Sequence, residues 1–137
     1  MAKVFTGKFK NCIEYLSNGY TLISIDKSIP SNYKTLIHYT IDELKPSWSM
    51  AKKSPQDQAQ AYNKKLAKLN PRDISKQILQ IIKDNKSKGA ILLTYEDKSR
   101  HSSRKQAADW LKKYTRVRPT EYKTKVIRIN KKLLTDD

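Results

Sequence analysis

The run Ala90-Ile91-Leu92-Leu93-Thr94-Tyr95 decides the fold class. A continuous apolar stretch of this length, preceded by a helical pattern and followed by a polar loop, is typical of a central strand of a parallel sheet, which is buried on both faces. Parallel strands need long crossover connections, usually helices. We therefore expect helices before and after this run, packed on the sheet that it centres.

Two further strands are predicted upstream. Tyr20–Ile25 is rich in β-branched and aromatic residues, and a short strand over Val4–Thr6 precedes it. Between them a helix is predicted from the helical spacing of Phe9, Ile13 and Leu16. Cys12 lies beside this apolar series, so we expect it in the core and not as a nucleophile. Residues 1–26 thus predict a first βαβ-like unit.

Residues 54–85 predict a pair of helices. Ser54-Pro55-Gln56-Asp57 combines a capping hydroxyl, a proline at the first helical position and an acid three residues after the cap. Asn70-Pro71-Arg72-Asp73 repeats the signal, so a second helix begins almost at once. The predicted inner faces are Ala59, Tyr62, Leu66 and Leu69 in the first helix and Ile74, Ile78, Ile81 and Ile82 in the second.

Residues 90–129 predict a strand-loop-helix-strand unit. The helix after the loop places four residues on its inner side: Ala107, Ala108, Leu111 and Tyr114. Lys123–Ile129 alternates and is expected as a strand at the sheet edge. Residues 27–53 are a long connection with only weak periodicity. The whole pattern predicts one compact α/β domain over residues 1–137, with a small, mostly parallel sheet flanked by helices.

The charge of the chain predicts an anionic partner. Its 29 Lys and Arg residues against 13 Asp and Glu give a net charge of +16, whereas a net charge of roughly 2–8 suffices for solubility of a small domain. A solvated lysine-rich surface is the alternative explanation. No apolar run reaches the roughly 18 residues of a membrane span. The start of the chain lacks the apolar stretch of a signal peptide, and one cysteine cannot form an internal disulfide, so we expect a cytoplasmic protein.

The positive charge is concentrated in the C-terminal third, which we predict to bind nucleic acid or another anion. Tyr122, beside Lys123, is the best candidate for an exposed ring on which a base could stack, although aromatic residues in such a pattern more often belong to the core. Charge alone does not distinguish DNA, RNA, an anionic membrane surface or an acidic protein. The candidate residues are Lys98, Arg100, Arg104, Lys105, Lys112, Lys113, Arg116, Arg118, Tyr122, Lys123, Lys125 and Arg128.

A second candidate site lies where strands end. Ligands of parallel sheets bind beyond the carboxyl ends of the strands, and Asp26, Glu96 and Arg104 follow two predicted strands. Arg104 and Lys98 could hold a phosphate while Glu96 orients them or acts as a base. Alternatively, Glu96 ties down Arg104 and Ser102 caps the helix. Three glycines exclude a phosphate-binding glycine loop, and one cysteine with two distant histidines excludes a structural zinc site, so no cofactor or metal is predicted.

The stretch AILLTYEDKSRHSSRKQAADWL, residues 90–111, resembles the signature of the domain-of-unknown-function 488 family. The likeness extends upstream to Leu22–Asp26, Pro30, Tyr39, Leu44, Pro46-Ser47 and Tyr62, and so covers most of the chain. The resemblance implies a Cys-His-Arg triplet at the start of the helix, but here Ser102 and Ser103 stand for its Cys and His, while Arg104 and Glu96 are kept. If the family is enzymatic, this member is expected to be inactive.

Two functions follow as expectations. The first is a non-enzymatic basic binding protein. Because the family occurs in bacteria and bacteriophages, the resemblance implies a bacteriophage factor in the host cytoplasm. Such a factor would engage host nucleic acid, or a nucleoprotein machine such as RNA polymerase, and inhibit it. The second is an enzyme that processes a nucleotide or nucleic acid at Asp26, Glu96 and Arg104.

Overall fold

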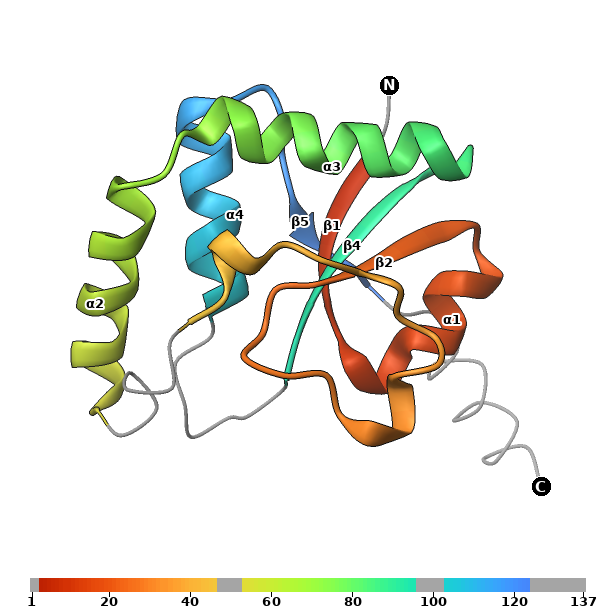
Figure 1. Ribbon diagram of the computed structural model, residues 1–137, viewed down its shortest axis with the longest axis horizontal. Helices are drawn as coiled ribbons and strands as arrows, with labels where there is room; N and C mark the ends of the chain where they lie inside the picture. Colours follow the sequence, from red (N-terminus) through yellow and green to blue (C-terminus); the bar gives the residue numbers. More distant parts are fainter. Residues whose placement is uncertain (1–2, 47–52, 96–102, 124–137) are drawn as a thin grey trace, which may run out of the picture.

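The computed structural model of the protein describes residues 3–46, 53–95 and 103–123 (Figure 1). Its strands are β1 (Lys3–Lys8), β2 (Tyr20–Ser24), β3 (Tyr39–Thr40), β4 (Gly89–Thr94) and β5 (Thr120–Glu121). Its helices are α1 (Cys12–Ser17), α2 (Pro55–Ala67), α3 (Pro71–Asn85) and α4 (Ser103–Tyr114), with 3-10 turns η1 (Phe9–Asn11), η2 (Ser31–Tyr33) and η3 (Asp42–Leu44). The described strands form one sheet in the order β3-β2-β4-β1-β5, and every pairing is parallel. The predicted α/β class is therefore confirmed.

Strand β4 occupies the centre of this sheet, as the apolar run predicted. All six of its residues are buried, and it pairs with β1 on one side and β2 on the other, so that Ile91 lies opposite both Phe5 and Leu22. A strand in this position meets side chains on both faces, which explains why its sequence is apolar throughout instead of alternating.

Two cores cover the two faces of the sheet. Ala90 and Leu92 of β4 pack with the buried residues of α2, α3 and α4. Ile91 and Leu93, which point the other way, pack in a second cluster with Cys12 and with residues of the connection after β2. In Figure 1 α1 accordingly lies apart from the other three helices. The chain leaving β1 thus crosses one face of the sheet, and the chain leaving β4 crosses the other.

The predicted helical pair is confirmed together with its caps. The Ser54 hydroxyl accepts a hydrogen bond from the Asp57 amide at 3.2 Å, and the Asn70 side chain accepts one from the Arg72 amide at 3.0 Å. Each cap satisfies an amide that has no partner within its helix. The buried residues are Tyr62 and Leu66 in α2 and Ile74, Ile78 and Ile82 in α3.

The first helix forms, but of the three apolar residues whose spacing predicted it only Phe9 is buried. Ile13 is 70% exposed and Leu16 is 40% exposed, whereas Phe9, Cys12 and Tyr15 are buried. A turn of 3-10 helix before α1 gives these three residues a common side. The Tyr15 hydroxyl accepts a hydrogen bond from the Lys8 amide at 3.1 Å, and this partner allows the ring to be buried. The expectation that Cys12 lies in the core is confirmed.

The remaining differences lie in α4 and at the sheet edges. Ala107, Ala108 and Leu111 are buried as predicted, but Tyr114 is 54% exposed because it is the last residue of α4. The predicted strand over Lys123–Ile129 stays a prediction, because residues 124–129 lie outside the described residues, and the described edge strand before it is β5. The connection after β2 contains β3, a two-residue strand too short to carry a periodic signal. No helix in the described ranges is long and apolar enough to cross a membrane.

Candidate anion-binding groove

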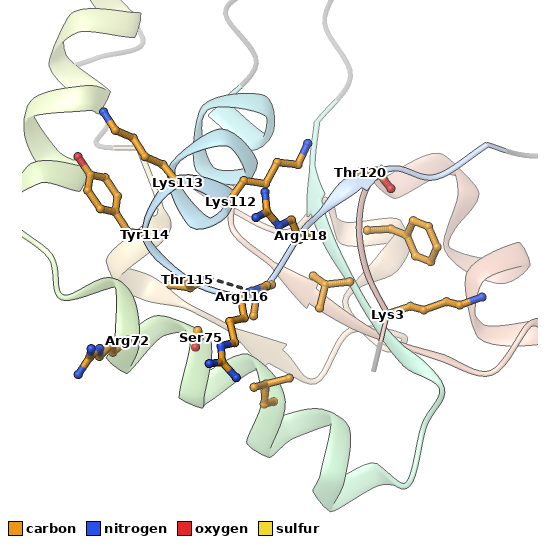
Figure 2. A pocket seen from close by; sticks show the side chains of 14 residues that line it. Lys3, Arg72, Ser75, Lys112, Lys113, Tyr114, Thr115, Arg116, Arg118 and Thr120 are labelled. Atoms are coloured by element: carbon orange, nitrogen blue, oxygen red, sulfur yellow. Dashed lines mark hydrogen bonds between the residues drawn. The ribbon is translucent and has the colours of Figure 1, made fainter. Parts of the chain in front are cut away.

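A groove with a volume of about 1110 Å³ lies between α3, the end of α4, the connection 115–120 and the start of β1 (Figure 2). Six of the residues that line it are cationic: Lys3, Arg72, Lys112, Lys113, Arg116 and Arg118. The others are Val4, Phe5, Ser75, Leu79, Tyr114, Thr115, Val117 and Thr120. None of these fourteen described residues is acidic.

The local structure of the connection after α4 explains why its two arginines face outward. Val117 is buried in the core on the side of α2, α3 and α4, and its amide donates to the Thr115 hydroxyl at 3.1 Å. Arg116 and Arg118 flank this buried residue in the sequence, and both are exposed. In Figure 2 the Arg116 side chain extends toward α3.

The groove combines positive potential with non-polar surface. A concave surface with charges of one sign focuses the electrostatic potential and concentrates counter-ions. Leu79 is 43% exposed and Tyr114 is 54% exposed at this groove. The Lys113 ammonium lies 5.3 Å from the centre of the Tyr114 ring, within the range of a cation–π contact. The groove can therefore attract an anion and also contact a planar or apolar part of it.

The structure brings together four of the predicted binding residues and adds two. Lys112, Lys113, Arg116 and Arg118 all line the groove. Lys3 and Arg72 were missed because they are far from these residues in the sequence, and only the sheet order, which places β1 beside β5, brings Lys3 close. Their presence carried no signal in the sequence beyond their charge.

The other predicted cations do not line the groove. Lys105 lines an adjoining hollow of about 430 Å³ between α4 and β5, which shares Lys112 and Thr120 with the groove, and Lys123 is exposed beyond β5. Four predicted residues, Lys98, Arg100, Lys125 and Arg128, lie outside the described ranges.

Arg104 is bound within the fold. Its guanidinium donates to both carboxylate oxygens of Glu121, at 2.9 and 3.0 Å, and to the Thr94 hydroxyl at 2.9 Å. The Thr6 hydroxyl donates to the same carboxylate at 2.6 Å. The positive charge of Arg104 is thus balanced by Glu121, so the structure does not support its predicted contact with an external anion. Glu96, the partner expected in the alternative interpretation, lies outside the described ranges.

Asp26 is also engaged by the backbone around it. Its carboxylate accepts hydrogen bonds from the Lys27 amide at 2.7 Å and from the Tyr95 amide at 2.6 Å. Asp26 and Arg104 therefore contact consecutive residues, Tyr95 and Thr94, at the carboxyl end of β4. Among the described residues no hydrogen bond or ion pair joins the two to each other.

The prediction that Tyr122 exposes its ring is wrong. The ring packs edge-to-face against Phe5, Tyr15 and Tyr20, with centroid distances of 5.2, 4.9 and 5.8 Å. Its hydroxyl accepts a hydrogen bond from the Asn18 side chain at 2.9 Å, and desolvation raises the pKa of the phenol. Tyr122 joins the segment after β5 to α1, and its half-buried ring packs against three other aromatic rings.

Within the described part of the chain, neither the cysteine thiol nor a cluster of metal-binding side chains forms a second candidate site. Cys12 is fully buried, and desolvation raises the pKa of its thiol to about 11, so it is not poised as a nucleophile. The described residues contain no group of three or more His, Cys, Asp or Glu side chains that could hold a metal ion.

Comparisons of the chain with protein-family models, with curated proteins and with solved structures find no match. The fold and the groove therefore define the class: an all-parallel α/β protein with a basic groove at one end of its sheet. The resemblance to the domain-of-unknown-function 488 family stays a prediction.

Proposed function

We propose that the protein is a non-enzymatic nucleic-acid-binding protein that holds a phosphate backbone in the groove. The observation that carries the proposal is the set of six cationic side chains, from four separate segments, in a groove without an acidic lining residue. Lys and Arg bind phosphate by neutralising its charge, and each such contact releases a counter-ion from the nucleic acid. An acidic protein surface is the alternative partner of the same groove.

A groove that holds the phosphate backbone binds without sequence preference. Asn and Gln, which pair with adenine, are absent from the fourteen lining residues, whereas Arg and Lys can pair with guanine as well as with phosphate. The proposal assigns the six cations to phosphate. Contacts to phosphate fix the position of a protein on nucleic acid but carry no sequence information. We therefore expect similar affinity for oligonucleotides of different sequence.

The test is a binding titration with a labelled oligonucleotide, followed by fluorescence anisotropy. The Arg116→Glu/Arg118→Glu variant reverses two exposed charges in the groove. Lys34→Glu/Lys53→Glu changes the net charge equally at two exposed positions that do not line it. The proposal expects a large loss of affinity in the first variant and a small one in the second. Equal losses would mean that net charge alone, and not the groove, governs binding.

On the resemblance and the charge together, we also propose the biological setting: a bacteriophage factor that engages host nucleic acid, or a nucleoprotein machine such as RNA polymerase, and inhibits it. Affinity purification from bacterial lysate, with and without nuclease, tests this. A nucleic-acid ligand predicts that host proteins are lost after nuclease treatment. A host complex that is retained without nucleic acid would instead point to a direct protein target.

The enzymatic alternative has less support from the site. Of its three residues, Asp26 is occupied by two backbone amides and Arg104 by Glu121 and Thr94. It predicts that Glu96→Gln abolishes turnover of a nucleotide or nucleic acid and leaves the fold intact. A biological effect that survives in Glu96→Gln would count against the enzyme.

A further inference from the structure

A smaller hollow lies at the opposite end of β1 from the groove. It has a volume of about 140 Å³ and is lined by Lys8, Phe9, Lys10, Tyr33 and Tyr95. The groove contacts residues 3–5 of β1 and this hollow contacts Lys8, so along a strand that rises about 3.3 Å per residue the nearest of these residues, Phe5 and Lys8, are roughly 10 Å apart. They share no lining residue.

The hollow lies at the edge of the sheet at which parallel sheets bind their ligands. It lies at the carboxyl ends of the adjacent strands β1 and β4. The chain leaving β1 enters α1, whose residues pack on one face, and the chain after β4 enters α4, whose residues pack on the other. A crevice opens where neighbouring connections diverge in this way, and ligands of open α/β sheets bind there.

Three aromatic rings from three separate segments form this hollow. The buried ring of Phe9 is nearly parallel to that of Tyr33, at a centroid distance of 6.2 Å and an interplanar angle of 14°. It meets the ring of Tyr95 at 6.3 Å and 63°. Tyr95 is 64% exposed although its amide is fixed by Asp26. The backbone of Tyr95 is therefore fixed, and its ring lies largely exposed beside the core residue Phe9.

We propose that this hollow binds the planar base of a nucleotide, stacked on Tyr95. Drug-sized ligands occupy pockets of about 300–1,000 Å³, so a hollow of about 140 Å³ has room for a single ring system and not for a whole nucleotide. Every base has a π-face, and stacking on an aromatic side chain is tolerant of base identity. The base could belong to a free nucleotide or to a nucleic-acid strand.

The test is isothermal titration calorimetry of the full chain with adenosine 5′-monophosphate, with inorganic phosphate as the reference ligand. The nucleotide should bind more tightly than phosphate. Stacking on one aromatic side chain contributes about 1–3 kcal/mol per base, so Tyr95→Ala should weaken nucleotide binding by roughly 5- to 150-fold. Tyr95→Phe, which keeps the ring, should bind as the wild type does. Because Tyr95 is largely exposed, both variants are expected to fold, and circular dichroism checks this.

A short oligoadenylate separates the two sources of the base. If the base belongs to a strand, Tyr95→Ala weakens oligoadenylate binding while the mononucleotide binds no better than phosphate. If neither ligand depends on the ring at position 95, the proposal is wrong. The Arg116→Glu/Arg118→Glu variant should leave mononucleotide binding unchanged. The proposal does not rest on the groove, so either site can fail without the other.

Discussion

The guanidinium of Arg104 and the carboxylate of Glu121 form a two-pronged ion pair between the start of α4 and the end of β5. Nε lies 2.9 Å from Oε1 and Nη2 lies 3.0 Å from Oε2. The third nitrogen of the same guanidinium, Nη1, donates to the hydroxyl of Thr94, the last residue of β4. One side chain therefore ties together the helix and both strands of the C-terminal unit. The arginine that the family resemblance would assign to a site has a structural role here.

Replacing Arg104 should destabilise the fold. Arg104→Ala removes the partner of Glu121 and of Thr94. The Arg104 side chain is 12% exposed, but Glu121 is 46% exposed, so solvent screens the pair. We expect a loss of about 1–2 kcal/mol in the free energy of unfolding, between the values of exposed and buried pairs. Urea denaturation measures it. The exposed neighbour Lys105→Ala is the control and should change stability by less than about 0.5 kcal/mol. An unchanged midpoint in Arg104→Ala would contradict the structural role.

Gly89 should not tolerate even a methyl group. A Cβ at this position would lie 1.8 Å from the Lys3 carbonyl oxygen, which belongs to the paired strand β1. Strands β1 and β4 would have to move apart, and overpacking of this kind typically costs about 1–3 kcal/mol. Thermal unfolding of Gly89→Ala should show a clearly lowered Tm. Lys88→Ala, at the exposed neighbouring position, should leave the Tm unchanged. A wild-type Tm in Gly89→Ala would show that β1 and β4 lie further apart than described.

The buried thiol of Cys12 predicts a pH dependence of stability. Desolvation raises its pKa from 9.0 to about 11 in the folded state. The folded protein holds this proton more tightly than the unfolded chain, so the contribution to stability is complete below pH 9 and is lost as the pH rises through 11. Comparing the wild type with Cys12→Ala by urea denaturation across this window isolates the effect of the thiol. The stability difference between the two should shrink as the pH rises, and a constant difference would contradict the burial.

The same thiol should react slowly in the native state. At pH 8 a thiol reagent attacks the thiolate, which both burial and the raised pKa suppress. Labelling should be slow in buffer and fast in urea. Rapid labelling without denaturant would show that α1 opens readily from the sheet.

The sequence predicted those elements that carry a dense local signal. The run over residues 90–95 identified the central strand because burial on both faces leaves no polar position in it. The helical pair was predicted because Ser54 and Asn70 cap their helices through side chains next to a proline. The exposed Ile13 was misplaced because a helix of six residues, entered through a 3-10 turn, has too few positions to define its face.

The groove was predicted only in part because it is a property of the sheet order. Lys112 and Arg116 are close in the sequence, and their charge density drew attention to them. Lys3 joins them only because β5 pairs with β1 in parallel. Glu121 was missed as the partner of Arg104 for the same reason, because the two meet only across the edge of the sheet. In the sequence Glu121 is one acidic residue among many basic ones.

The salt dependence of nucleic-acid binding tests the central claim most directly. If the six groove cations each neutralise a phosphate of a single strand, the logarithm of the binding constant should fall with the logarithm of salt concentration with a slope of about −4. In the Arg116→Glu/Arg118→Glu variant the slope should be shallower by at least about 1.4. A slope near zero, or one that the variant leaves unchanged, would contradict the assignment of the groove as the site that holds the phosphate backbone.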